Sequence, residues 1–162
     1  MTTWRPVSGW HGFYEVSDEG QVRSVDRISF GKKHRGRILR PSSTPKGYKI
    51  AVLSGHGERR SYPVHRLVAE SFLGPLPEGM HTMHLDGDNT NNRVSNLRYG
   101  TASENELDKV RHGRNPNANK THCPQGHPYD AGNTFLGSKG DRRCRTCHRE
   151  KKRAYDARRR AS

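Results

Sequence analysis

Four side chains in the last third of the chain constrain its folding more than any other feature of the sequence. They follow the pattern C-x3-H, a gap of sixteen residues and C-x2-C, and are Cys123, His127, Cys144 and Cys147. Thiolate sulfur and imidazole nitrogen are ligands that tetrahedral Zn²⁺ prefers, and the two-residue spacing lets two thiolates converge on one ion. Because every cysteine of the chain belongs to the pattern, we expect a zinc-binding module at residues 122–150, with His122 or His148 as substitutes for the histidine ligand.

The predicted zinc would be structural, because four protein ligands leave no open position for a reacting water. Metal binding would fold about thirty residues that are too few to bury a stable core by themselves. The folded module would then present basic side chains to phosphates, and these candidates for DNA binding are Arg142, Arg143, Arg145 and Arg149. The alternative is a flexible tail whose cysteines bind nothing.

The charge of the chain indicates a polyanionic partner. Thirty Lys and Arg residues against sixteen Asp and Glu residues give a formal net charge of +14. Residues 142–160 hold ten basic and two acidic residues, which account for eight of these fourteen charges. Such a distribution is typical of proteins that bind the phosphate backbone of nucleic acids, although basic ribosomal proteins share it.

Low hydrophobicity favours small modules over one large core, since only 29% of the 162 residues are hydrophobic. The amino terminus lacks a charged leader followed by an apolar run, and the longest aliphatic stretch is 50–53. We therefore expect neither export nor a membrane-spanning segment. The expected location is the cytoplasm, where thiols serve metals more often than disulfides.

The first sixty residues predict a β-rich module. Short stretches at 13–16, 21–28 and 48–53 carry β-forming residues and are separated by glycines. Between them lies the basic segment GKKHRGR at 31–37. It suits a hairpin loop that contacts phosphates and equally a solvated surface turn.

A helix is expected next, because the apolar residues of 63–73 recur at helical spacing and Gly74 followed by Pro75 ends the pattern. His65 and Arg66 lie off its apolar stripe. We expect them to be surface or buttressing residues.

A β-β-α unit follows this helix. Residues 80–85 and 93–99 predict two short strands, joined by the turn-forming segment DGDNTNN. A helix at about 103–112 comes after them, with Ser103 and Glu106 as its capping box.

Leu107 and Val110 supply this second helix with a narrow apolar face, and Asn105 falls roughly opposite Leu107, away from the core. Residues 113–121 are turn formers without periodicity and predict a linker. Residues 151–162 predict a short basic helix or a tail that is disordered until it meets nucleic acid.

The β-β-α unit would bring the end of its first strand close to the start of its helix, so that His84 and Asn105 face the same phosphate. A neutral imidazole can accept a proton from water, and an amide oxygen can hold a hard cation such as Mg²⁺, which keeps most of its own waters. Asn96 can orient His84 through hydrogen bonds to the backbone of the connecting loop. A histidine beside a turn and asparagines in loops also have purely structural explanations.

The segments VHRLVAESFLG and MHLDGDNTNNRVSNLRYGTASEN resemble the HNH homing endonucleases that are common in bacteriophages and group I introns, over residues 64–112. The resemblance implies a ββα-metal fold that hydrolyses DNA phosphodiester bonds with Mg²⁺ or Mn²⁺. It also implies His84 as general base, Asn96 as the residue that orients it and Asn105 as metal ligand. The products would carry a 5′ phosphate and a 3′ hydroxyl.

One position departs from the family pattern. Many members carry Asp or Asn immediately before the catalytic histidine as a second metal ligand, whereas this chain carries Met83. A thioether is a poor ligand for a hard cation. Either Asn105 serves alone with waters and phosphate, which we favour, or Asp86 contributes, although Asp86 is also explained as a turn residue.

The N-terminal segments WRPVSGWHGFYEVSDEGQVRSVDR, GRILRP and GYKIAVL, over about 3–53, resemble the fourth type of nuclease-associated modular motif. The resemblance implies a part in DNA recognition, and the candidate DNA-binding residues are Arg23, Arg27, Lys32, Lys33 and Arg35. Trp4, Trp10 and Tyr14 would either stack on bases or form the core of so small a module. At the other end, CPQGHPYDAGNT with RRCRTCHRE resembles the zinc-ribbon-like tail of many phage HNH proteins.

The sequence as a whole predicts an α+β protein with a small ββα-metal nuclease core between an N-terminal antiparallel β module and a C-terminal zinc-bound module. The expected segments are a DNA-recognition module at 1–60, the HNH core at 61–112, a linker at 113–121, the zinc-binding module at 122–150 and a basic tail at 151–162. The predicted function is metal-dependent DNA cleavage, as nicking or double-strand cleavage, by a protein encoded by a phage or mobile element and acting in the bacterial host cytoplasm.

Double-stranded DNA is the expected partner, with no membrane and no small-molecule substrate, and a monomer is favoured. An arginine is expected to assist, with Arg93, Arg98 and Arg66 as candidates. The alternative function is a non-catalytic zinc-containing DNA-binding protein, which Met83 keeps open. A calcium-binding EF-hand at 86–97 is excluded, because its sixth position lacks glycine and its twelfth lacks glutamate.

Overall fold

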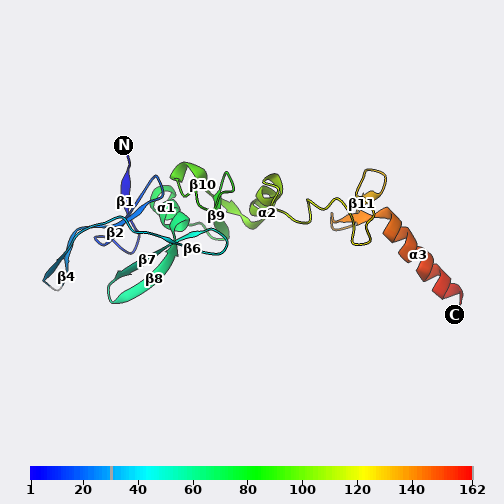
Figure 1. Cartoon of the computed structure of the whole chain (residues 1–162), viewed down its shortest axis with the longest axis horizontal. Coiled ribbons are helices and arrows are strands. Elements are labelled where there is room, and N and C mark those ends of the chain that lie inside the picture. Colours follow the sequence, from blue (N-terminus) through cyan, green and yellow to red (C-terminus); the bar gives the residue numbers. More distant parts are fainter. Residues whose placement is uncertain (30, 162) are drawn as a thin grey trace. The chain divides into compact units, whose positions relative to one another are not determined.

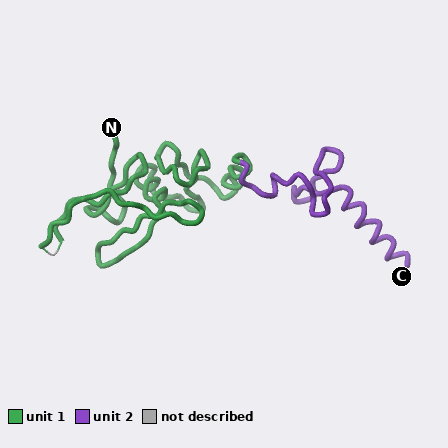
Figure 2. Tube along the Cα trace, in the orientation of Figure 1, with its two compact units in different colours: residues 1–112 green, residues 113–162 purple. Residues whose placement is uncertain are grey.

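The computed structural model describes residues 1–29 and 31–161, so Phe30 of the predicted N-terminal module and Ser162 of the predicted basic tail lie outside the described residues. Two compact units divide the chain, residues 1–112 and residues 113–162 (Figure 2). The elements follow one another as labelled in Figure 1.

Antiparallel strands make up the first half of the first unit. One sheet has the order β1-β2-β3, with strands at Trp4–Pro6, Tyr14–Ser17 and Val22–Ser24. A hairpin joins β4 and β5, at Arg27–Ser29 and Lys32–His34. A second sheet has the order β6-β7-β8, with strands at Ser42–Ser43, Lys49–Gly55 and Glu58–Pro63.

The single strand expected at 21–28 is wrong, because the chain changes partner within it. β3 pairs with β2, whereas β4 pairs with β5. Between them Asp26 accepts a hydrogen bond from the backbone N–H of Gly36 at 2.6 Å, which holds the entry to the hairpin.

The second half of the first unit is a helix followed by a β-β-α unit. α1 spans Val64–Leu73, as the apolar spacing predicts. β9 (Met80–His84) pairs antiparallel with β10 (Leu97–Thr101), and a short 3₁₀ turn, η1 (Val94–Asn96), precedes β10. α2 spans Ala102–Arg111 and packs across both strands.

The cap and the inward face of α2 differ from the expectation. Thr101 and Glu104 form the capping box, because Thr101 Oγ1 accepts from the N–H of Glu104 and the Glu104 carboxylate accepts from the N–H of Thr101. Leu107 and Val110 are 55% and 45% exposed, so the predicted apolar face is wrong. The inward residue is Asp108, which Arg98 of β10 holds by an ion pair of 2.8 Å.

One hydrophobic core serves the whole first unit. Its residues come from the first sheet, from β7, from α1 and from the start of β10, and they include Trp10, Val16, Leu53, Val68 and Leu97. α1 contacts the first sheet, the second sheet and the β9–β10 pair, as its central place in Figure 1 shows. The N-terminal strands and the β-β-α unit are therefore parts of a single packed body.

The second unit is small and built around one helix. β11 (Thr134–Leu136) and β12 (Arg142–Cys144) form a hairpin that leads directly into α3 (Arg145–Arg160). Within the described residues the predicted basic tail is thus helical, and α3 buries none of its residues. None of the described helices combines the length and the apolarity needed to cross a bilayer.

Replacement of Leu53 by alanine tests whether the first unit has a single core. Leu53 is fully buried in β7, so Leu53→Ala should lower the free energy of unfolding by about 2–5 kcal/mol. Urea denaturation of the full chain measures this change. Val52→Ala is the matched control, because Val52 is 38% exposed on the same strand and should cost less than about 1 kcal/mol. Equal effects of the two substitutions would contradict the shared core.

Candidate functional site

His84 is the last residue of β9 and lies opposite Leu97 of β10. Its side chain is only 8% exposed. The ring nitrogen Nε2 lies 3.1 Å from the side-chain oxygen Oδ1 of Asn92, which is also buried. The side chain of the predicted catalytic histidine is thus nearly buried and fixed by a hydrogen bond to Asn92.

Two further rings pack near the ring of His84. The ring of His65 in α1 lies edge-on at 5.1 Å between centroids, and the ring of Tyr48 lies 6.2 Å away. Burial, followed by the charges of His84 and Arg66, lowers the pKa of His65 to about 4. His65 is therefore uncharged at neutral pH and buttresses His84, whereas its neighbour Arg66 is exposed.

Asn96 fixes the loop that joins β9 to β10. Its Oδ1 accepts from the N–H of Asp86 at 3.0 Å, and its Nδ2 donates to Asp86 Oδ1 and to the carbonyl oxygen of Asn91. The backbone of Leu85 also donates to the carbonyl oxygen of Asn96. Asn96 therefore binds the loop that immediately follows His84.

Both carboxylate oxygens of Asp86 are used to fold this loop. Oδ1 accepts from Asn96 and from the N–H of Asp88, and Oδ2 accepts from Asn91 at 2.7 Å. Although desolvation raises the pKa of Asp86, these hydrogen bonds lower it below its usual value. The structure thus gives Asp86 the part of a turn residue.

Asn105 lies in the first turn of α2. Its side chain is half-buried and makes no hydrogen bond to another side chain or backbone group in the described part of the chain. The sulfur of Met83 in β9 packs against Gly100 of β10, because a Cβ added to Gly100 would lie 2.5 Å from it. His84 contacts Asn92, and Asn96 binds the loop that follows His84, so these three residues lie in or beside the β9–β10 loop. Asn105 belongs to α2 instead.

Two of the three candidate arginines are held in ion pairs. Arg98 binds Asp108 at 2.8 Å and Glu104 at 3.5 Å, and the hydrogen bond from Arg98 is the largest of the effects that lower the pKa of Asp108. Arg93 pairs with Glu19 at 2.9 Å. Arg66 is exposed like Arg93, and among the described residues it is the candidate that forms no ion pair.

The N-terminal candidates fall into two groups. Arg23 pairs with Glu15 at 2.6 Å and lies over the ring of Trp4 at 4.1 Å, and Arg27 lies over Phe13. The remaining candidates are exposed on or beside the β4–β5 hairpin and are Lys32, Lys33 and Arg35.

Of the N-terminal aromatic residues, Trp10 and Tyr14 belong to the core. Base stacking by these two rings, one of the alternatives, is therefore wrong. Tyr14 also donates a hydrogen bond to the carbonyl oxygen of Ser54, which ties β2 to β7.

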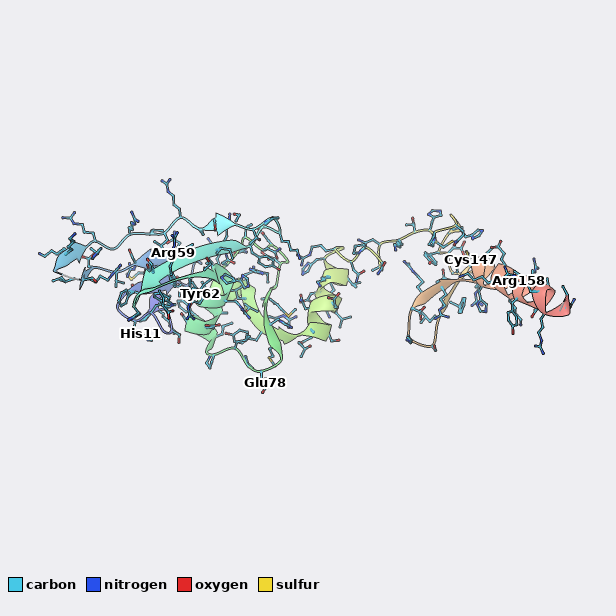
Figure 3. The ribbon with its side chains drawn as sticks, turned by 90° about the horizontal axis from the view of Figure 1, so that it is seen from below. His11, Arg59, Tyr62, Glu78, Cys147 and Arg158 are labelled. Atoms are coloured by element: carbon cyan, nitrogen blue, oxygen red, sulfur yellow. The ribbon has the colours of Figure 1, made fainter. Side chains whose placement is uncertain are left out.

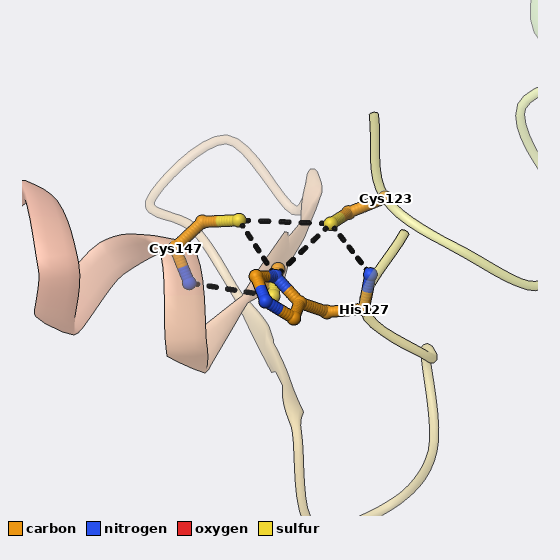
Figure 4. Close-up of side chains that lie close together, drawn as sticks. Cys123, His127 and Cys147 are labelled. Atoms are coloured by element: carbon orange, nitrogen blue, oxygen red, sulfur yellow. Dashed lines mark hydrogen bonds between the residues drawn. The ribbon is translucent and has the colours of Figure 1, made fainter. Parts of the chain in front are cut away.

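The four predicted zinc ligands converge in the second unit. Their ligand atoms, from Cys123, His127, Cys144 and Cys147, all lie within 4.8 Å of one another. Figure 4 shows the side chains of Cys123, His127 and Cys147 close together. The ligand atoms of these three residues lie 3.2–3.6 Å from one another. Tetrahedral Zn²⁺ with these ligand types holds neighbouring ligand atoms roughly 3.5–3.8 Å apart. The cluster is therefore compatible with a bound metal ion.

Hydrogen bonds to sulfur support this cluster. The N–H of His127 donates to Cys123 Sγ, and Asn133 Nδ2 donates to Cys144 Sγ at 3.3 Å. Although burial raises it, hydrogen bonds from Cys147 and Asn133 lower the pKa of Cys144 to about 7. Burial and the adjacent thiols raise the pKa of Cys147 to about 12. Neighbouring thiolates repel one another, and a divalent cation bound between them would offset this repulsion.

The C-terminal arginine candidates differ in availability. Arg142 donates to the carbonyl oxygens of Asn117 and Lys120 and stacks on a tyrosine, so it serves within the unit. Arg143 pairs with Asp141 at 2.7 Å. Arg145 and Arg149 are both exposed at the start of α3, but Arg145 also donates to the carbonyl oxygen of Thr134 and lies over the ring of Phe135.

Two asparagines of the candidate sites are not predicted from the sequence. Asn92 contacts His84, and Asn133 contacts both Cys144 and Thr146. Each lies in a segment of turn formers, where asparagine is common for local reasons. For Asn92, the only local sequence feature that points to a role in the site is the Asn91-Asn92 pair close to the predicted catalytic histidine. For Asn133, no local sequence feature points to such a role.

Two families match the chain. The HNH endonuclease family matches residues 62–107, and the NUMOD4 motif matches residues 3–54. The solved structure described as DNA binding and cleavage by the HNH homing endonuclease I-HmuI aligns with a TM-score of 0.58 and 33% identity, over 70% of this chain and 60% of that one.

Among curated proteins, the DNA endonuclease I-HmuI of Bacillus phage SP01 is 32% identical over 110 residues, which cover 68% of this chain and 59% of the relative. The SPbeta prophage-derived YosQ of Bacillus subtilis (strain 168) is 40% identical over 72 residues, which cover 43% of this chain and 41% of the relative. The chain thus spans about half the length of these relatives. It carries an HNH endonuclease domain behind a NUMOD4 motif, and its homologues include phage and prophage-derived HNH homing endonucleases.

Proposed function

We propose that this chain is a metal-dependent endonuclease that hydrolyses a phosphodiester bond of double-stranded DNA, by nicking or by double-strand cleavage. The observation that carries the proposal is the buried His84 at the end of β9, held through Nε2 by Asn92, inside a matched HNH endonuclease domain. The homologue I-HmuI is named a DNA endonuclease, and its structure is described as DNA binding and cleavage.

The proposed reaction begins with a water placed beside His84. The free ring nitrogen accepts a proton while the water oxygen forms a bond to phosphorus, and the bond from phosphorus to the 3′ oxygen breaks. The leaving 3′ oxygen takes up a proton, which leaves a 3′ hydroxyl and a 5′ phosphate. Asn96 and Asp86 support this step by holding the loop next to the histidine.

A hard divalent cation, Mg²⁺ or Mn²⁺, would stabilise the charge that develops on the phosphate. The donor set offers the amide oxygen of Asn105, because Met83 is a poor ligand and Asp86 is used in the loop. One protein oxygen suits Mg²⁺, which retains several waters and takes further oxygens from substrate phosphate. Asn105 is therefore the residue that we propose to hold the cation.

In the second unit we propose a structural Zn²⁺ on Cys123, His127, Cys144 and Cys147. Two thiols are buried, and N–H groups donate to the sulfurs, as expected around thiolate ligands. With four protein ligands the ion would have no open position and would take no part in hydrolysis. Its part would be to hold the start of α3.

We further propose that α3 grips the phosphate backbone. Figure 3 shows Cys147 at its start and Arg158 near its end, with side chains projecting along its length. Six basic residues at helical spacing share one face around a single acidic residue, Asp156, and these six are Arg145, Arg149, Lys152, Arg153, Arg159 and Arg160. Such a stripe is complementary to a polyanion. Exposed basic residues of the β4–β5 hairpin would add to this binding.

Replacement of His84 tests the catalytic proposal. His84→Ala should reduce Mg²⁺-dependent or Mn²⁺-dependent cleavage of a plasmid by about 10²- to 10⁴-fold, because the general base is removed, while DNA affinity is retained. Gel analysis of cleavage and a filter-binding assay measure the two quantities. His81→Ala is the matched control, since His81 is exposed on the same strand. A wild-type chain that binds DNA but never cuts it would instead support a non-catalytic DNA-binding protein.

Elemental analysis tests the zinc proposal. The wild-type chain should carry about one zinc ion, and Cys144→Ser should lose it because the ligand set becomes incomplete. Limited proteolysis should then cut residues 113–162 readily and leave residues 1–112 intact. His148→Ala and His122→Ala should both retain the metal, and loss of zinc from either would assign the histidine ligand differently.

The salt dependence of DNA binding tests the part of α3. Arg149→Ala combined with Arg153→Ala should weaken binding and reduce the slope of log affinity against log salt by about 0.9 for each phosphate that the variant no longer binds. Lys151→Ala, on another face of α3, should change the slope less. An unchanged slope in the double variant would contradict the proposed grip.

A further inference from the structure

We infer that Asn92 is a positioning residue that fixes His84 in the tautomer with hydrogen on Nε2 and a lone pair on Nδ1. The inference deepens the proposed function and rests on it for the catalytic consequence. It identifies which nitrogen of His84 accepts the proton of water, and it assigns part of the active-site geometry to the N-terminal module.

The first step is the hydrogen bond itself. His84 and Asn92 are 8% and 5% exposed, and Nε2 lies 3.1 Å from Oδ1. An amide oxygen only accepts hydrogen bonds, so the nitrogen that faces it must carry the hydrogen. A neutral imidazole has a single N–H, and Nδ1 is then left with the lone pair that a general base needs.

The second step is the way in which Asn92 is held. Gly20 has a φ of +84°, and a Cβ at this position would lie 2.9 Å from the backbone of Asn92. On either side, the N–H of Val94 donates to the carbonyl oxygen of Asp18 at 2.8 Å, and the carbonyl oxygen of Asn91 accepts from Asn96. The 18–20 turn of the N-terminal module therefore packs directly on the residue that orients His84.

The third step is that the other neighbours of His84 do not choose between its nitrogens. His65 from α1 and Tyr48 from the segment before β7 contact it through their rings. Asp86 and Asp88 act on it through charge, from the loop. Of these neighbours and Asn92, only Asn92 makes a hydrogen bond to the ring.

Nitrogen NMR of the full chain with labelled histidine tests the inference without DNA. Wild-type His84 should be protonated at Nε2 and unprotonated at Nδ1 near neutral pH. Asn92→Ala should mix the two tautomers and lower kcat for DNA cleavage on the order of 10- to 100-fold, with KM changed less than about twofold. Asn89→Ala is the matched control, because Asn89 lies in the same loop and donates to the carbonyl oxygen of Lys46 instead.

Asn92→Asp supplies a second readout. A carboxylate still accepts from Nε2, so the tautomer should persist, while the added negative charge favours the positively charged form of the ring over the neutral form that accepts a proton. The low-pH limb of the pH–rate profile should therefore move to higher pH, which a merely structural asparagine would not cause. Thermal unfolding of each variant checks the fold.

Two results would overturn the inference: wild-type His84 with hydrogen on Nδ1, or an unchanged tautomer in a folded Asn92→Ala variant. The tautomer is read without metal or DNA. Failure of the wild type to cut DNA would therefore overturn the proposed function separately.

Discussion

The first unit depends on one hydrophobic core that joins the N-terminal strands to the HNH domain. Val16 in the first sheet, Leu53 in the second and Val68 in α1 are all fully buried in it. Because apolar burial is the main favourable contribution to folding, neither part has a complete core without the other. The NUMOD4 segment is thus a structural part of the domain that holds the candidate active site.

Polar contacts then build the site on this core. The loop after β9 buries little apolar surface and is ordered by side-chain amides and carboxylates, chiefly Asn96, Asn91 and Asp86. Such networks hold their shape only when each member finds a partner. Here the partners lie within the loop and on the 18–20 turn, so the core below and the turn beside it fix the position of His84.

Much of the architecture follows from local sequence patterns. The apolar spacing of 63–73 predicts α1, and the C-x3-H and C-x2-C pattern predicts the ligand cluster, because both depend on short spacings alone. The cap and the inward face predicted for α2 are wrong, since Asp108 is buried through an ion pair with Arg98 on another element. Asn92 and Gly20 are not predictable for the same reason, because their contact joins residues that only the folded chain brings together. The roles of His84, Asn96 and Asn105 remain predictions.

The central claim is that His84 and Asn105 serve one scissile phosphate. A crystal structure of the full chain with a DNA duplex and Mn²⁺, in which anomalous scattering locates the ion, tests it most directly. The account predicts Mn²⁺ bound by the amide oxygen of Asn105 and by a phosphate oxygen, with Nδ1 of His84 facing a water beside the same phosphorus. An ion bound elsewhere, or His84 and Asn105 directed to different phosphates, would contradict it.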